Sequence, residues 1–226
     1  MTIPTFLYGG GTVDVDNHSS GVLASETIIC RSFIVRAGAT VTCLGANPRI
    51  IASKFIYVEL GGTLSADGLS NNAGSQPGGA GGNGGNGLGH GGAAGTASAP
   101  QAFDGLILFQ SGAGTGNLAG AGGGPQAGTP GAPGGSLVLV APTVVILGTV
   151  SSRGLPGGNA TAGDCGGGGG GGGGTISLLA DSLAFGASAA FLVTGGLGGA
   201  PTGAGVAGQA GGAGFIKQLE DHFTQL

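Results

Sequence analysis

The stretch "AGDCGGGGGGGGGTISLLAD" (residues 162–181) places nine consecutive glycines, Gly166–Gly174, directly before an apolar segment. Such a run is typical of a flexible tether, of a phosphate-binding loop, or of a folded element that needs glycine at every position. The choice concerns the whole chain, because 58 of its 226 residues are glycine, whereas average usage is roughly 7%.

The rest of the composition favours a folded protein over a tether. The chain is 40% hydrophobic and only 7% charged, with a mean hydropathy of +0.38. Disordered segments are polar and charged, and flexible glycine linkers are rich in serine. Here the glycine runs instead alternate with apolar, β-branched segments that supply surface to bury.

Charge and hydropathy also limit the partners. The net charge is −4 and the chain has six Lys and Arg in total, so no cationic cluster is available for a nucleic-acid backbone. The longest apolar stretch, residues 137–147, is too short to span a bilayer and is broken by Pro142. The first residues lack the basic and apolar regions of a secretory signal, which predicts assembly in the cytoplasm of the producing cell.

The titratable residues do not form a recognisable catalytic or metal-binding pattern. The three cysteines make an odd count without metal-site spacing, which predicts free thiols in a reduced compartment and leaves a Cys30–Cys43 disulfide as an alternative. The histidines are scattered, and no acid pair or nucleophile motif is present. We therefore expect no enzyme activity, no cofactor and no metal; the residues in question are Cys30, Cys43, Cys165, His18, His90 and His222.

A repeat organises the apolar segments. Three stretches share the order strand, glycine turn, short strand and glycine-rich run, and each follows a further apolar strand. They are "FIYVELGGTLSADG" (55–68), "VVILGTVSSRG" (144–154) and "LAFGASAAFLVTGG" (183–196), preceded by strands that begin at Arg49, Gly135 and Thr175. An earlier, less regular unit is "TIICRSFIVRAGATVTCLG" (27–45).

Short strands that recur without helical spacers predict an all-β fold, specifically a short-coil β-solenoid or β-helix. Each coil of such a stack buries its inward side chains against the next coil, and its open end needs a cap. The apolar residues of 215–226 fall close to a 3.6-residue period. We expect this C-terminal segment to be the cap, as a short amphipathic helix.

The glycine-rich runs fit neither a nucleotide site nor a calcium site. "GNGGNG" (82–87) lacks the following helix and the acidic residue of a dinucleotide fingerprint, and no run contains the Gly-Lys-Ser/Thr of a P-loop. Calcium-binding repeats need carboxylates, but Asp104 is the single formal charge between residues 69 and 152.

A bundle of extended threefold helices is the remaining folded interpretation. A polyproline-II-type helix has three residues per turn and no internal hydrogen bonds, so its backbone groups are free to bond laterally. Close packing on all sides requires glycine at nearly every position. The sequence thus predicts polyglycine-II bundle insertions, with Gly166–Gly174 as their most enclosed helix.

The coil pattern and the glycine runs together resemble a known family. "FIVRAGATVTCLG" (33–45) and "GGTLSADGLSNNAG" (61–74) look like a motif of glycine-rich bacteriophage virion proteins, and the alternation resembles the distal long-tail-fibre adhesins of T-even-like phages. The resemblance implies a β-solenoid attachment part and a polyglycine-II sandwich with receptor-binding loops at its far end. It implies a location in the virion.

These observations predict three regions and one main function. Residues 1–68 form an N-terminal attachment part, 69–214 the glycine-rich repeats and 215–226 the cap. The N-terminal part, with its charges, is expected to bind another virion protein of the fibre, tail or capsid. The glycine-rich part is expected to bind a bacterial surface receptor through residues that interrupt the glycine runs: Asn71, Asn72, Gln76, Phe103, Asp104, Arg153 and Asn159.

Two alternatives stay open. A capsid decoration protein, a head fibre or another purely structural virion protein would use the same scaffold without receptor binding. The segment around Phe103 and Asp104 also fits a further buried strand in place of a binding loop.

Overall fold

The computed structural model describes residues 12–45, 47–69, 81–82 and 122–220. Within these ranges every regular element is a β-strand, which confirms the predicted all-β class. Among the same residues no helix has the length and apolarity needed to cross a membrane.

The strands are short and each pairs with its neighbours in parallel. Most of them follow the predicted repeat, and their Val, Ile, Thr, Leu and Phe content suits buried or half-buried strands. They are β1 (Asp14–Asn17), β2 (Gly21–Val22), β3 (Thr27–Val35), β4 (Thr40–Thr42), β5 (Arg49–Val58), β6 (Thr63–Ser65), β7 (Ser136–Val140), β8 (Thr143–Ile146), β9 (Thr149–Ser151), β10 (Thr175–Ala180), β11 (Ser182–Phe185), β12 (Ala190–Leu192) and β13 (Phe215–Glu220).

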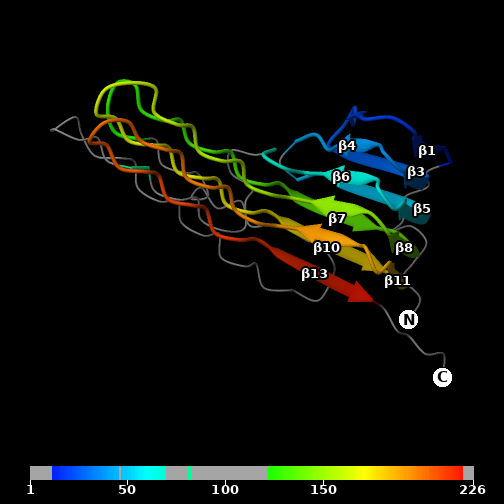
Figure 1. The fold of residues 1–226 in the computed structure, drawn as a ribbon. Coiled ribbons are helices and arrows are strands. Elements are labelled where there is room, and N and C mark those ends of the chain that lie inside the picture. Colours follow the sequence, from blue (N-terminus) through cyan, green and yellow to red (C-terminus); the bar gives the residue numbers. More distant parts are fainter. Residues whose placement is uncertain (1–11, 46, 70–80, 83–121, 221–226) are drawn as a thin grey trace.

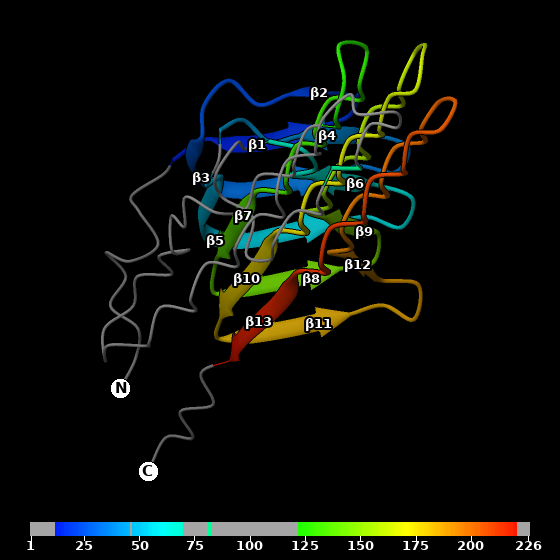
Figure 2. The ribbon, with the colours of Figure 1, turned by 90° about the vertical axis from the view of Figure 1, so that its left-hand side faces the viewer.

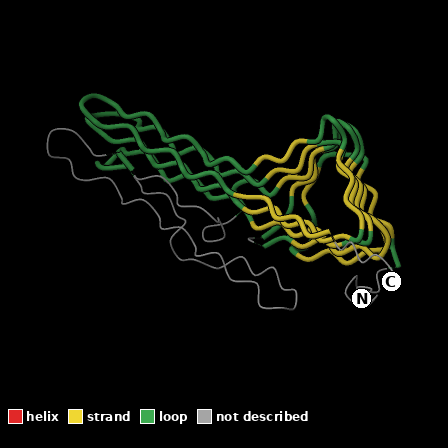
Figure 3. Tube along the Cα trace, turned by 90° about the horizontal axis from the view of Figure 1, so that it is seen from below, coloured by secondary structure: helices red, strands yellow, loops and turns green. Residues whose placement is uncertain are grey.

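Two parallel sheets result, and the chain visits them alternately. The first sheet has the order β1-β3-β5-β7-β10-β13, and β8 and β11 continue it beside the second half of β5. The second sheet has the order β2-β4-β6-β9-β12. Each time the chain returns to a sheet, it adds a strand next to the one that it formed there before. The strands therefore stack as successive coils around a shared interior (Figures 1 and 3).

The interior consists of columns of aligned apolar side chains. In the first sheet Phe33, Ile56 and Val144 stand in register and are fully buried. In the second sheet Val41, Leu64 and Val150 do the same. Such alternation of buried and exposed positions fixes the register, since a slip of one residue would turn every apolar side chain outward.

The sheet continues across the glycine-rich run that follows residue 68. β5 pairs in parallel with both β7 and β8, although residues 59–135 lie between β5 and β7 in the sequence. The attachment part and the repeats of the sequence analysis therefore share one sheet. Figure 1 shows β5 and β7 side by side in that sheet.

Glycine-rich legs run from the coils to a distant end and back. Outgoing legs (152–160 and 194–200) alternate with return legs (122–134, 166–174 and 206–214), and hydrogen bonds join them at every third residue. Gly167, Gly170 and Gly173 donate to the carbonyls of Val206, Gln209 and Gly212, while Gly168, Gly171 and Gly174 donate to those of Gly158, Leu155 and Ser152. The hydrogen bonds between legs therefore recur with a three-residue period.

The return leg Gly166–Gly174 is buried along its whole length. It exchanges hydrogen bonds with legs on several sides, among them 128–134, which donate to it. A Cβ added at Gly170 would overlap the carbonyl oxygen of Gly196, and one at Gly171 would overlap that of Ala132. The run therefore requires glycine for close backbone packing.

The predicted C-terminal helix is wrong for residues 215–220, and the rest of that prediction, residues 221–226, lies outside the described residues. Residues 215–220 form β13, which pairs in parallel with β10 from Thr175↔Phe215 onward. Apolar residues at 215, 216 and 219 satisfy a short helical pattern and a strand equally. Pairing with β10 favours the strand over the helix, because the preceding leg ends where residue 215 is in register with β10.

Candidate functional site

Among the described residues, three turns lie at the end of the legs farthest from the sheets, and we call them the distal turns (residues 123–127, 161–165 and 201–205). Figure 1 shows this end projecting from the strands, and Figure 2 shows the turns next to one another. Each contains a glycine with positive φ: Gly124 at 104°, Gly163 at 70° and Gly203 at 56°. Glycine adopts this conformation without the steric penalty of other residues, so these positions set where the chain reverses.

Hydrogen bonds tie the distal turns together. Thr161 donates its N–H to the carbonyl of Gln126 at 3.1 Å. The Asp164 carboxylate accepts the N–H of Ala204 at 2.8 Å, and the Thr202 N–H donates to the Cys165 carbonyl at 3.0 Å. The turns thus form one connected surface.

The exposed side chains of this surface are small and mostly neutral. Gln126, Thr161 and Ala204 are exposed, whereas Cys165 is buried beneath them. The described parts of the turns contain no aromatic residue. Chemically, the surface offers hydroxyl, amide and backbone groups for hydrogen bonding, without a nucleophile or an acid–base pair.

Asn159, a predicted receptor contact, lies just before a distal turn. Its side-chain oxygen accepts the N–H of Ala200 at 2.8 Å, and its side chain is otherwise exposed. It therefore fastens two outgoing legs together next to the turn surface.

Arg153, another predicted contact, lies at the opposite end of the legs, where they leave the sheet. Its Nε and Nη2 donate to the Asp67 carboxylate at 3.0 and 2.8 Å. Asp67 also accepts the backbone N–H of Arg153 at 2.6 Å and the hydroxyl of Ser151. The pair borders a hollow of about 280 Å³ with the exposed side chains of Leu155 and Leu197.

Sequence reasoning missed the pairing of Arg153 with Asp67, although a signal was present. "SADG" and "SSRG" occupy the same place in successive repeats, and the structure aligns Ser65 with Ser151. Opposite charges at equivalent positions of neighbouring coils predict an ion pair. The structure separates this pair from Asn159, so the two contacts do not form one site.

The other predicted receptor contacts, Asn71, Asn72, Gln76, Phe103 and Asp104, lie outside the described residues. The same holds for the alternative of a buried strand around Phe103. These expectations remain predictions.

Charged residues gather on the outer face of β1 and β3, in the part predicted to bind another virion protein. Arg31 pairs with Asp14, and Arg36 bridges Asp16 at 2.7 Å and Glu59 at 2.8 Å. Hydrogen bonds from Arg31 hold the pKa of the Asp14 carboxyl well below its usual range, and those from Arg36 lower the pKa of Asp16. The face therefore stays ionised, with its charges largely paired.

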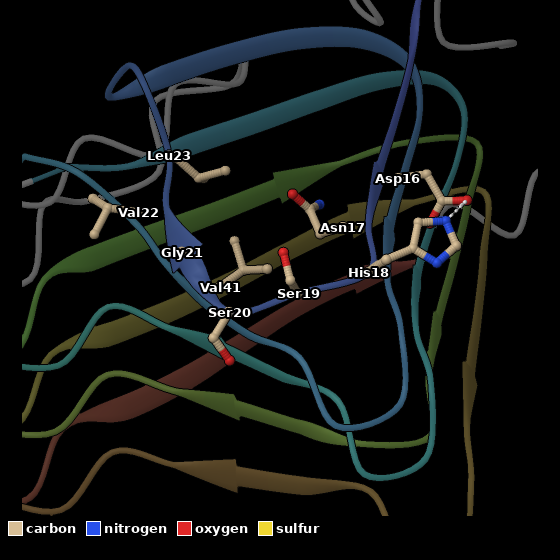
Figure 4. A pocket seen from close by; sticks show the side chains of 9 residues that line it. All are labelled: Asp16, Asn17, His18, Ser19, Ser20, Gly21, Val22, Leu23 and Val41. Atoms are coloured by element: carbon tan, nitrogen blue, oxygen red, sulfur yellow. Dashed lines mark ion pairs between the residues drawn. The ribbon is translucent and has the colours of Figure 1, made fainter.

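A polar hollow of about 330 Å³ opens at the β1–β2 end of the stack (Figure 4). His18 lies 3.3 Å from the Asp16 carboxylate, and the Asn17 side chain donates to the carbonyl of Ile34 at 2.8 Å. A Cβ added at Gly21 would meet nothing within 4 Å. Figure 4 shows the side chains of Asn17, Ser19 and Val41 around this space.

The cysteines are free and buried, so the alternative of a Cys30–Cys43 disulfide is wrong. Burial raises the pKa of the Cys30 thiol to about 11 and that of Cys43 to about 12. Low thiolate content and poor access both make such thiols inert.

Within the described residues, no group of three or more His, Cys, Asp or Glu side chains is placed to hold a metal ion. Comparison with known proteins found no matching family model, no matching curated protein and no matching solved structure.

Proposed function

We propose that this chain is a non-enzymatic structural component of a bacteriophage virion, acting as a tail-fibre-tip or tail-associated adhesin that binds the host cell surface. In this proposal the coils are a β-solenoid, and the legs form a polyglycine-II sandwich inserted between coils. The solenoid attaches to the fibre or tail, and the distal turns contact the receptor.

The observation that carries the proposal is the three-residue hydrogen-bond pattern that leads to the distal turns. Gly166–Gly174 is bonded laterally to neighbouring legs on several sides, so the legs form a stiff support. Loops on a rigid scaffold are frequent carriers of binding function. The scaffold places three turns together, far from the sheets (Figure 2).

A second candidate is a capsid decoration or other purely structural virion protein. It is favoured by the modest chemistry of the distal turns, whose exposed residues include Ala162, Gly163 and Ala204. Strong protein–receptor contacts commonly involve aromatic and arginine side chains, and the described turns have neither.

The first experiment is a cryo-EM reconstruction of the particle that carries the chain. Density at the tip of a fibre or tail would support the adhesin, whereas density on the capsid shell would exclude it and support the decoration protein.

Turn variants then test receptor contact directly. We expect Thr161→Arg and Ala204→Arg to reduce adsorption to the host at least tenfold, about the effect of 1.4 kcal/mol, with unchanged melting temperature. Ala213→Arg, exposed at the sheet end of a leg and away from the turns, is the matched control. Normal adsorption of both turn variants would rule out binding by the distal turns.

A further inference from the structure

The strands β7 and β10 are buried on both faces of the first sheet. Their side chains at positions 137, 139, 176 and 178 belong to the interior and are fully buried. The side chains that alternate with these lie on the outer face. All six are at most 9% exposed, and we call them the covered face: Ser136 (3%), Val138 (6%), Val140 (9%), Thr175 (4%), Ser177 (2%) and Leu179 (2%).

The covered face differs from the outer face of the neighbouring strands β8 and β11. There Val145 aligns with Ala184, and these two outward positions are half-buried and exposed, respectively. A sheet that is buried on both faces has a layer packed on each of them. The covered face therefore requires a layer on the outside of β7 and β10.

An apolar row crosses the covered face. Val140 and Leu179 are aligned, with Ile51 on one side of the pair and Leu219 on the other. The exposed fraction is 9% at Val140 and 2% at Leu179, but 40% at Leu219. Among the described residues, the hydrophobic side chain that packs against the cluster of Val138, Val140 and Leu179 is Ile51, which belongs to the same sheet. The described chain thus contributes no hydrophobic layer above this face.

The chain between residues 82 and 122 is long enough to reach the covered face. Gly82 donates to the carbonyl of Gly167, and Gly123 donates to that of Gly82, so both ends of 83–121 lie beside the distal turns. The return leg 122–134 runs from there to the start of β7. Residues 83–121 are three times as many as this leg contains, enough to run to the sheet, cross it and return.

The sequence of 83–121 fits such a path. Its outer thirds, 83–95 and 109–121, are rich in glycine like the described legs, whereas the middle third, 96–108, has a single glycine. Most of the stretch "AFDGLILF" (102–109) falls in this middle third, and we call 102–109 the apolar segment. Legs of equal length therefore bring the apolar segment to the sheet end.

Charge is complementary as well. Arg49 and Lys217 flank the row of Val138 and Ser177 on the covered face. The apolar segment carries one charge, the carboxylate of Asp104, which is opposite in sign to both flanking side chains.

From these observations we propose that the apolar segment packs on the covered face of its own chain, as a layer outside β7 and β10. The proposal does not rest on the adhesin function. The N-terminal residues 1–11 are a weaker candidate, because β1, which follows them, pairs with the half of β3 that aligns with β8 and β11. Residues 221–226 have two large apolar side chains, Phe223 and Leu226, too few to cover six positions.

This packing has a consequence for receptor binding. Phe103 and Asp104 belong to the apolar segment, so they lie at the sheet end of the legs, opposite the distal turns. A receptor held by the distal turns does not contact them.

Photo-cross-linking identifies the layer that covers the face. We place p-benzoylphenylalanine at Ile51 or at Leu219, on the margins of the covered face, irradiate the purified full chain and map the linked peptides by mass spectrometry. Both positions are expected to link to residues 102–109 of the same molecule. Ala184, exposed on β11, is the control position and should not link to them. Links to residues 1–11, to residues 221–226 or to a second copy in place of 102–109 would overturn the proposal.

Alkylation tests whether the apolar segment protects the face. Val140→Cys is expected to react slowly with a maleimide. Adding Leu106→Asp and Ile107→Asp, which change both sides of an extended segment, should accelerate the reaction at least about tenfold. Cys43, buried in the interior, should stay unreactive and so report that the coils remain folded.

The matched control for this experiment is Ala210→Asp, exposed on a return leg, which should leave the reaction at position 140 unchanged. An equally slow reaction with both aspartates in the apolar segment would show that a different layer covers the face and overturn the proposal.

Discussion

Gly170 shows most directly what the glycine run does at the scale of one residue. Its N–H donates to the carbonyl of Gln209, and its α-carbon faces the carbonyl of Gly196 with no room for a side chain. The loss of conformational entropy that glycine incurs on folding is offset here by lateral hydrogen bonds along the whole leg.

We expect Gly170→Val to destabilise the chain by at least about 3 kcal/mol, the upper range for overpacked positions. Ala210→Val, an exposed position on the neighbouring return leg, is the control and should change stability by less than about 0.5 kcal/mol. Chemical denaturation of both variants measures the difference. Equal midpoints would show that the run is a tether.

Ion pairs on the outer face of β1 and β3 predict a pH dependence. Arg36 lowers the pKa of Asp16, and the Ala37 N–H and Arg36 lower that of Glu59. Because these pKa values are lower in the folded chain, the unfolded chain takes up more protons as the pH falls below about 4, and stability is lost there. Asp16→Asn should lower the melting temperature at pH 7 and flatten its decline in acid; profiles that run parallel to the wild type would contradict this.

At the scale of the elements, the Asp67–Arg153 pair joins one coil to the leg of the next. Asp67 accepts hydrogen bonds from the Ser151 hydroxyl, the Arg153 N–H and the Arg153 guanidinium, with its side chain 15% exposed. Losing such an acceptor leaves partly buried donors without a partner.

Asp67→Ala is accordingly expected to destabilise the chain by about 1–3 kcal/mol. Gln209→Ala, at an exposed position on a return leg, serves as the control for side-chain truncation. Thermal melts compare the stability of the two variants. If Asp67→Ala is as stable as Gln209→Ala, the Asp67–Arg153 pair does not contribute to stability.

The elements also show how far the sequence predicts the structure. The repeat placed β5 to β12 correctly, because β-branched residues and glycine turns recur at matching positions. The repeat does not predict β1 and β2, since β1 is short and polar, β2 has only two residues, and their partners lie in later coils. The apolar period of residues 215–226 predicts a helix, but residues 215–220 form β13, because pairing with the neighbouring strand β10 decides the structure there.

The candidate site was less predictable than the strands. The loops that come together are set by the number of residues in each leg before the chain reverses. Glycine-rich segments have no apolar periodicity from which this number can be predicted. The distal turns are marked by Gly124, Gly163 and Gly203 in the left-handed region, but among 58 glycines these three are not distinguishable by sequence.

At the scale of the whole molecule, coils and legs alternate along one chain. The leg pair 152–174 is inserted between β9 and β10, and the pair 194–214 between β12 and β13. Neither the coils nor the legs form one continuous segment of the chain. Unfolding of either one therefore releases the chain ends that hold the other in place. We therefore expect the coils and the legs to unfold in one transition.

Cys43 and Cys165 provide probes for this cooperativity, because one lies among the coils and the other at the distal turns, both buried. In variants that retain one of these cysteines, alkylation should begin at the same denaturant concentration. Earlier reaction of Cys165 would show that the legs melt separately.

The three-residue spacing of the hydrogen bonds between legs has a consequence for how related chains can differ in length. An outgoing leg and its return leg are bonded to each other through positions such as Gly171 to Leu155 and Gly168 to Gly158. A single inserted residue would rotate everything beyond it by a third of a turn and misalign these bonds. Insertions or deletions are therefore expected in triplets, one on each leg of a pair. Evolution could move the turns outward or inward in discrete steps while the coils beneath them stayed unchanged.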